Sequence, residues 1–419
     1  MPGVAVDCLF GSIVAAWAII MEPEAVRLKL TSWWAERQGL LRQQDRTAQE
    51  TLEAFGWLRS VGGMAPYLSL FVRSGISKAA AEKELAEKGI HELPSARGCV
   101  HFLPKRDYRL GLSLASCHRS DSDIGPATKH FGLTQEELER LCQGVLAALE
   151  PGPLDPKALK QKLGELVRTF PPEGKKYGLT TSLPMALGIL QRRGQIRRIP
   201  FDGRLDGERY LYAAWPDGPM EEGPLNEDEA LVQLASLYWD WLGAASLRHF
   251  KWFSGVSVTK CRKAVESLGL VTLEGSELLI KAADTESLSQ WNPPSEPVYR
   301  FVSSLDSILM ARRDLASIIS PKDQERPAYK EAGVLAVGGL SDVSSHMILD
   351  RGTIAGFWDY DPAERKIIAH LWRESTQQYR EELDRTETFI RDEVGDARSF
   401  SLDSPSSRQG RLSFLRSQQ

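Results

Sequence analysis

A helix–helix–hairpin pattern between residues 155 and 215 constrains the fold more than any other feature of this 419-residue sequence. Asp155 and Pro156 are suited to begin the first helix, because aspartate caps the free amides of a first turn and proline fits the position after the cap. A second helical stretch, residues 183–193, ends at Gly194, and two β-prone stretches follow around a polar turn. Two helices and a two-stranded wing are typical of a winged helix-turn-helix, whose second helix is the recognition helix.

The same pattern returns between residues 220 and 292. A helix extends through Trp241, further helical stretches follow, and Ser257 is placed to cap the last of them. A strand, a turn at Gly275 and a second strand complete the unit. Residues 21–150 contain several helices and a short hairpin, which suggests an irregular copy of the same unit.

The rest of the chain is rich in β-prone stretches and turns, which suggests a small antiparallel β-barrel, and its last residues are rich in Ser, Arg and Gln, which predicts disorder. The predicted fold class is therefore α+β and helix-rich, with tandem winged helix-turn-helix modules and a carboxy-terminal small antiparallel β-barrel. The predicted parts are residues 1–20 (a misplaced start or a disordered extension), 21–150 (irregular winged-helix or helical domain), 151–219 (second winged helix), 220–292 (third winged helix), 293–395 (β-barrel plus helix) and 396–419 (disordered tail).

The amino terminus contains an apolar segment. The residues from Cys8 to Ile20 carry no charge, but they are fewer than the ~20 needed to span a bilayer. Asp7 stands where a signal peptide has basic residues. We interpret residues 1–20 as a misplaced start or a frayed extension, with a weakly membrane-associating segment as the alternative, and we predict no membrane partner.

Charge is distributed unevenly along the sequence. The chain has 52 basic and 56 acidic residues and a net charge of −4, which argues against a protein covered throughout by nucleic acid. Residues 155–215 nevertheless contain twelve Lys and Arg against six Asp and Glu, and residues 246–281 contain six against three. The excess of positive charge therefore falls on the two units that have the winged-helix pattern.

Basic side chains near the predicted recognition helices and wings are the candidate DNA contacts, because guanidinium and ammonium groups bind phosphate oxygens. A solvated charged face, or a protein-interaction surface, is the alternative interpretation. The candidates are Lys175, Lys176, Arg192, Arg193, Arg197, Arg198, Arg204, Lys260, Arg262 and Lys263.

Motifs for metal or cofactor chemistry are missing from the sequence. The five cysteines form no C-x-x-C pair, and His91, His101 and His118 lack metal-site spacing. No Gly-rich phosphate loop and no G-x-S-x-G motif occurs. We therefore predict no metal, no cofactor and no bound nucleotide. The scattered cysteines favour a reducing compartment, the cytoplasm, or the nucleoid within it if the chain is bacterial.

Several short segments occur together in a fixed order. They are Arg37–Leu40, Leu58–Tyr67 followed by LSLFVR, Ala96–Pro104, Gly152–Asp155, Ser304–Asp306, Ala311–Asp314 and ILDRGTIAGFW. In this ordered set the chain resembles the winged-helix DNA glycosylases of the AlkZ and YcaQ type, which excise bulky alkylated bases and unhook crosslinks. The resemblance implies tandem winged helices around a nucleic-acid cleft, closed by a barrel, with double-stranded DNA, damaged DNA included, as the partner.

The catalytic motif of that family differs here. In the family a Gln-hydrophobic-Gln or Gln-hydrophobic-Asp motif precedes Pro-Tyr and positions the water that attacks the glycosidic bond. At the equal spacing this chain has Arg59 and Val61, followed by Tyr67. A guanidinium stays protonated and cannot act as a base, and valine cannot hold a water molecule. Arg59 is suited instead to a phosphate or a leaving base, with a plain ion pair as the alternative.

The sequence thus predicts a monomeric winged-helix DNA-binding protein that acts on damaged or distorted DNA without the usual catalytic pair. One alternative is an active DNA glycosylase that hydrolyses the N-glycosidic bond with other residues, such as Tyr67, Glu36 or Asp306. The other is a transcriptional regulator or a protein-interaction scaffold.

Overall fold

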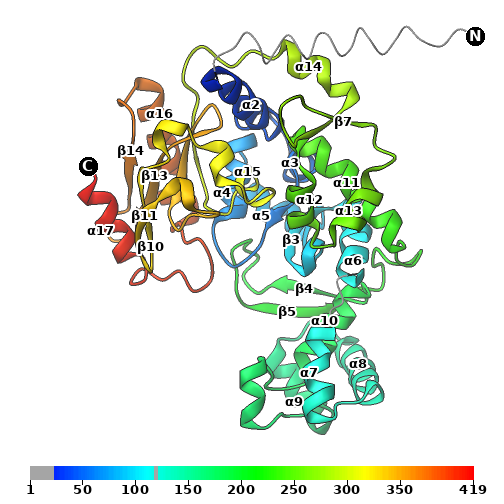
Figure 1. Ribbon diagram of the computed structural model, residues 1–419. Helices are drawn as coiled ribbons and strands as arrows, with labels where there is room; N and C mark the ends of the chain where they lie inside the picture. The colour runs from blue at the N-terminus through cyan, green and yellow to red at the C-terminus, as the bar shows by residue number, and fades with distance from the viewer. Residues whose placement is uncertain (1–22, 118–120) are drawn as a thin grey trace, which may run out of the picture.

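The computed structural model describes residues 23–117 and 121–419, so our interpretation of residues 1–20 lies outside the described part. Helices and short antiparallel sheets alternate along the chain, which confirms the predicted α+β class. Figure 1 shows a large upper body and a smaller helical unit below it, joined by the hairpin of β4 and β5.

The first part of the chain consists of helices around a three-stranded antiparallel sheet, in the order β1-β3-β2. Its register places Arg59 opposite His101 on the neighbouring strand. The elements are α2 (Pro23–Arg37), α3 (Ala48–Phe55), β1 (Leu58–Arg59), α4 (Ala65–Ser74), α5 (Lys78–Ala86), β2 (Ile90–Pro94), η1 (Ala96–Gly98), β3 (Val100–Pro104), η2 (Lys105–Asp107) and α6 (Tyr108–Cys117).

The lower unit in Figure 1 has a hydrophobic core of its own. Asp155 caps its third helix as predicted, because the carboxylate accepts a 2.7 Å hydrogen bond from the Ala158 amide. The elements are α7 (Asp121–Phe131), α8 (Gln135–Leu149), α9 (Pro156–Leu163), η3 (Gly164–Leu166), η4 (Pro172–Tyr177), α10 (Leu183–Arg192), β4 (Ile196–Pro200) and β5 (Tyr210–Ala214).

Helix α10, the predicted recognition helix of this unit, is buried. Between Leu183 and Leu190 only Pro184 and Gly188 reach the surface, and the helix packs against α8 and α6. A recognition helix needs a polar face that enters a groove of DNA, so this assignment of α10 was wrong. The physical reason is that apolar residues occupy nearly every position of the helix rather than one stripe.

The next unit shares its core with α6 and contains a three-stranded sheet in the order β6-β8-β7. Ser257 caps α13 as predicted by accepting a 3.3 Å hydrogen bond from the Lys260 amide. The elements are α11 (Glu227–Leu242), β6 (Ala244–Ala245), α12 (Leu247–Ser254), α13 (Val258–Val265), β7 (Leu270–Thr272) and β8 (Leu279–Lys281).

The carboxy-terminal part is built on an open four-stranded antiparallel sheet, in the order β14-β13-β12-β9, that shares a core with α2, α3 and α4. The elements are η5 (Ala282–Asp284), α14 (Thr285–Gln290), β9 (Tyr299–Val302), α15 (Ser307–Met310), η6 (Leu315–Ile318), η7 (Pro321–Asp323), β10 (Pro327–Lys330), β11 (Gly333–Ala336), η8 (Val337–Gly339), β12 (His346–Asp350), β13 (Thr353–Asp361), β14 (Lys366–Leu371), α16 (Gln377–Phe389), the π-helix η9 (Ile390–Val394) and α17 (Gln409–Ser417).

The predicted β-barrel is wrong, because no sheet in the described part of the chain closes on itself. The end strands β9 and β14 are flanked by helices instead, with α16 against β9 and α17 against β14. Packing against helices buries apolar side chains of this sheet, so closure into a barrel is not needed to cover them.

The predicted disordered tail is also wrong. Helix α17 lies on β13 and β14, and its Leu412 and Leu415 are fully buried. Arg411 in the same segment donates to the buried carboxylates of Asp359 and Asp403. The Ser- and Arg-rich composition suggested disorder because it does not reveal contacts with β13, where Asp359 and Asp361 pair with Arg411 and Arg416.

Candidate functional site

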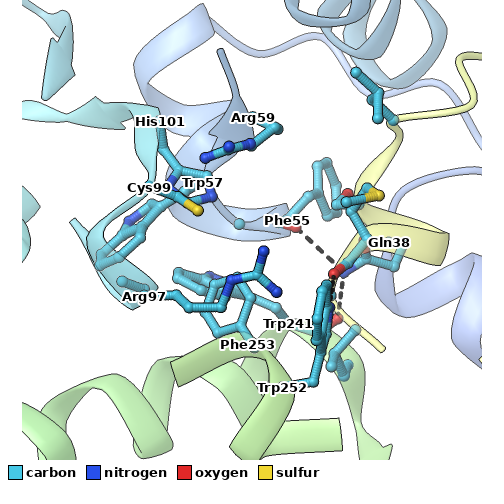
Figure 2. A pocket seen from close by; sticks show the side chains of 17 residues that line it. Gln38, Phe55, Trp57, Arg59, Arg97, Cys99, His101, Trp241, Trp252 and Phe253 are labelled. Atoms are coloured by element: carbon cyan, nitrogen blue, oxygen red, sulfur yellow. Dashed lines mark hydrogen bonds between the residues drawn. The ribbon is translucent and has the colours of Figure 1, made fainter. Parts of the chain in front are cut away.

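A pocket beside Arg59 lies between β1, η1, α12 and α15, and its cavity measures about 50 Å³. Figure 2 shows Arg59 and Arg97 on opposite sides of this space. The residues that line it are Gln38, Phe55, Gly56, Trp57, Arg59, Ala96, Arg97, Cys99, His101, Trp241, Leu242, Trp252, Phe253, Leu305, Ser307, Met310 and Ala311.

Backbone pairing brings Arg59 to the pocket. Strand β1 is only two residues long and follows α3, whose end is set by Gly56 at a φ of 102°. Pairing with β3 holds Arg59 beside His101, and Nη1 of Arg59 donates one long hydrogen bond of 3.4 Å to the carbonyl oxygen of Val100. Among the described residues no carboxylate pairs with this guanidinium, so the ion-pair interpretation of Arg59 was wrong.

Arg97 reaches the pocket from η1, where its φ of 58° is a left-handed conformation that is unusual for a residue with a side chain. Its guanidinium carbon lies 3.7 Å from the ring centroid of Trp252 on α12. The Arg313 guanidinium lies 4.3 Å from the same ring, and Arg313 also has a positive φ of 51°. Two strained arginines from different segments therefore converge on one indole beside the pocket.

His101 is buried beside the two guanidinium groups. Its Nδ1 shares a 2.8 Å hydrogen bond with the Ser95 hydroxyl. Burial, together with the positive charges of Arg59 and Arg97, lowers the pKa of His101 to about 3. The imidazole is therefore neutral near pH 7 and does not add to the positive charge of the pocket.

The apolar side of the pocket consists of packed aromatic rings. The ring centroids of Trp57 and Trp241 are 5.5 Å apart, and Phe253 contacts both rings. Gln38 holds the adjoining wall: its amide nitrogen donates to the carbonyl oxygens of Phe55 and Trp241, and its amide oxygen accepts from Ser307. Figure 2 shows the two bonds donated by Gln38 as dashed lines.

The other candidate catalytic residues do not line this pocket. Val61 contacts the carboxy-terminal segment, since its carbonyl oxygen accepts from the Ser401 amide. The Tyr67 hydroxyl donates to Glu82 at 2.6 Å and accepts from the Leu205 amide. Asp306 is fully buried in a two-bond ion pair with Arg73, and Glu36 lies half-buried on α2. Only Arg59 among these candidates lines the pocket.

Many of the predicted DNA contacts pair with carboxylates of this chain. In the lower unit Arg193 binds Glu139, Arg198 binds the buried Glu92 at 2.9 Å, and Arg204 binds Asp206 at 2.7 Å. Arg204 also lies over the ring of Tyr67. Arg198 and Arg204 therefore join the lower unit to the upper body.

The remaining predicted contacts occupy different settings. Lys260 and Lys263 on α13 form exposed ion pairs with Glu227 and Asp228 on α11, whereas Arg262 between them is exposed. Lys175 and Lys176 are exposed in η4. Arg192 is half-buried at the end of α10, and Arg197 is half-buried in β4, where burial lowers its pKa.

Three residues of the site were missed in the sequence as functional side chains: Arg97, Trp252 and Arg313. Arg97 and Arg313 occurred only as landmarks of a family resemblance. The signal for Arg97 was its place before Gly98 in a turn, since a turn next to a short strand exposes a side chain at the strand's end. The contact of Trp252 with both arginines depends on tertiary packing.

In the described residues, no group of three or more His, Cys, Asp or Glu side chains is arranged so that it could hold a metal ion. Likewise, within residues 23–117 and 121–419, no helix combines the length and the apolar character needed to cross a bilayer.

Comparison with known proteins agrees with this architecture. The chain is similar in structure to a Streptomyces sahachiroi DNA glycosylase, AlkZ, with a TM-score of 0.64, 17% sequence identity, and coverage of 88% of this chain and 97% of that one. No curated protein matches the chain in sequence. Residues 60–389 match the family described as DNA glycosylase AlkZ-like. Since this match spans most of the sequence, the chain belongs to the AlkZ-like DNA glycosylase family.

Proposed function

We propose that this protein binds double-stranded DNA that is damaged or distorted, as a monomer, and does not excise bases by the water-activating motif of its family. The observation that carries the proposal is the pocket of Arg59 and Arg97. It lies at the family's motif position and presents two guanidinium groups without a carboxylate partner in the described chain. Such groups attract the phosphates of nucleic acid.

The lining of the pocket supports binding rather than hydrolysis. Base excision needs a group that takes a proton from water or holds the water in position. None of the described residues that line the pocket is a carboxylate, and Gln38 uses its amide for contacts within the protein. The two arginines remain protonated near neutral pH and cannot act as bases.

The unit of α11, α12, α13 and the sheet β6-β8-β7 supports a winged-helix interpretation, with α13 as the recognition helix. Lys260, Arg262 and Lys263 are on the exposed face of α13. The ion pairs of Lys260 and Lys263 are at the surface, where such pairs stabilise a protein by only ~0–1 kcal/mol. Exchange of these carboxylates for DNA phosphates is therefore energetically accessible.

The test is a fluorescence-polarisation titration with intact, alkylated and nicked duplexes, combined with an assay for released base. We expect the protein to bind a damaged duplex more tightly than the intact one and to release no base. The double substitution Arg59→Ala with Arg97→Ala should weaken the binding of the damaged duplex. Release of a base only in the presence of the protein would contradict the proposal that it does not excise bases, and would favour an active glycosylase. Equal binding to damaged and undamaged DNA with a marked sequence preference would favour a transcriptional regulator instead.

A further inference from the structure

The pocket has room for a phosphate group. Its cavity measures about 50 Å³. Since about 10–15 Å³ of such a cavity is enough for one water molecule, the space can take several atoms of that size, such as the oxygens of one phosphate group.

Among the charged and indole N–H groups of the described residues that line the pocket, those of the two guanidinium groups are available to a ligand. The indole N–H groups of Trp57, Trp241 and Trp252 already donate to Asp107, to the carbonyl oxygen of Glu53 and to the carbonyl oxygen of Met310. Arg59 makes one long hydrogen bond, and Arg97 stacks on Trp252 through its face. A guanidinium has five N–H donors in its plane, so stacking leaves the donors of Arg97 available.

Two contacts with α12 restrain the exposed side chain of Arg97 before any ligand arrives. Gly255 ends α12 with a φ of 77°, and a Cβ atom there would lie 2.5 Å from Cγ of Arg97. Trp252, held by its bond to Met310 and by Arg313 near its ring, supports the guanidinium. A preorganised donor loses little entropy on binding, which favours a specific ligand over a diffuse ion atmosphere.

Charge favours the end of a DNA strand over its interior. A phosphate monoester carries about −1.5 to −2 charges at pH 7 and three free acceptor oxygens. Two guanidinium groups match that charge, whereas an internal phosphodiester carries a single charge and continues as a chain on both sides. A monoester enters a small recess from one side only.

We propose that Arg59 and Arg97 form a binding site for the terminal phosphate of a DNA strand, as found at a nick or a strand end. The proposal rests on the proposed DNA-binding function and specifies the ligand of its central pocket.

The experiment compares three nicked duplexes of one sequence in fluorescence-polarisation competition: one with a 5′-phosphate at the nick, one with a 3′-phosphate and one with only hydroxyls. We expect one phosphorylated nick to bind about tenfold more tightly than the hydroxyl nick, a difference equivalent to ~1.4 kcal/mol. Arg59→Ala and Arg97→Ala should each abolish this preference. Arg380→Ala, an exposed arginine on α16, should retain it.

Equal affinity of the wild-type protein for all three nicks would overturn the proposal, while DNA binding itself would stand. If an alanine variant fails to fold, Arg59→Lys or Arg97→Lys takes its place, because lysine keeps the charge but lacks the planar, forked donors of a guanidinium. The lysine variants should reduce the preference for a phosphorylated nick. A second measurement needs no DNA: inorganic phosphate should raise the Tm of the wild-type protein above that in chloride of equal ionic strength. If the protein does not bind duplex DNA but phosphate still raises its Tm, the proposed function is rejected and the phosphate site is not. If phosphate does not raise the Tm, the result counts against the phosphate site.

Discussion

At the scale of single residues, the ion pair of Arg73 and Asp306 joins α4 to the start of α15. Two hydrogen bonds of 2.8 Å connect the fully buried side chains, and the Asp306 carboxylate also accepts from Ser69 and the Ile308 amide. Burial opposes ionisation of Asp306, but Arg73 and these hydrogen bonds outweigh it, and its pKa is lowered. Asp306 is therefore a structural residue rather than the catalytic base of the glycosylase alternative.

The substitution Asp306→Asn should lower the free energy of unfolding by ~3–5 kcal/mol, because it leaves a buried guanidinium without its counter-charge. Urea denaturation followed by circular dichroism measures this change. Asp392→Asn, in an exposed pair with Arg391, is the control and should have little effect. Similar stability losses in the two variants would show that the buried pair has no special role.

Two buried histidines predict a dependence of stability on pH. Burial, with added repulsion from nearby basic side chains, lowers the pKa of both His91 and His101 to about 3, against about 6.5 for a free histidine. Between these values the unfolded chain binds protons that the folded chain does not. The stabilising contribution is complete above pH 6.5 and decreases as the pH falls toward 3. Urea unfolding at pH 7.5, 6 and 5 should show this decrease, with a smaller slope for His91→Phe; a free energy independent of pH would contradict it.

At the scale of elements, the close contact between α12 and η1 depends on Gly255. Gly255→Ala should destabilise the protein, because it adds left-handed strain of ~1–2 kcal/mol and a clash with Arg97. It should also weaken DNA binding by displacing that guanidinium. Gly275→Ala is the matched control, since Gly275 has a similar φ of 72° and no atom within 4 Å of the added Cβ. Urea denaturation and DNA titration compare the two; equal effects would refute the role of the contact.

Helix α17 should contribute strongly to stability, although its composition suggested disorder. Leu412→Ala and Leu415→Ala each remove a fully buried side chain and should lower the free energy of unfolding by ~2–5 kcal/mol. Leu402→Ala, at a side chain that is 80% exposed, should change it by less than ~0.5 kcal/mol. Thermal denaturation distinguishes the variants, and unchanged stability in all three would indicate that α17 does not pack as described.

Elements that depend on neighbouring residues could be predicted from the sequence, whereas elements that depend on distant contacts could not. The caps Asp155 and Ser257 were predicted correctly, because capping depends on residues within one helical turn. The buried position of α10 could have been read from its apolar residues on all sides. The open sheet could not be predicted from its own residues, because its end strands pack against α16 and α17, which occur later in the sequence. Composition alone gives no information on such long-range contacts.

At the scale of the whole molecule, the net charge of a sequence segment does not show which of its basic side chains stay free of carboxylate partners. The lower unit carries an excess of positive charge in sequence, but Arg193, Arg198 and Arg204 pair with carboxylates, two of which lie elsewhere in the chain. The guanidinium groups of Arg59 and Arg97, outside the segments with that excess, have no carboxylate partner in the described structure. Folding decides which charges are neutralised, and a count along the sequence cannot.

The salt dependence of DNA binding tests the central claim most directly. The measurement is the slope of log K against log salt concentration for a nicked, phosphorylated duplex, with the wild-type protein and with Arg59→Ala combined with Arg97→Ala. Each phosphate contact contributes about −0.9 to this slope. If the two arginines bind a phosphate of DNA, the slope of the double variant should be smaller in magnitude by about one. An unchanged slope and affinity would show that the pocket does not contact DNA.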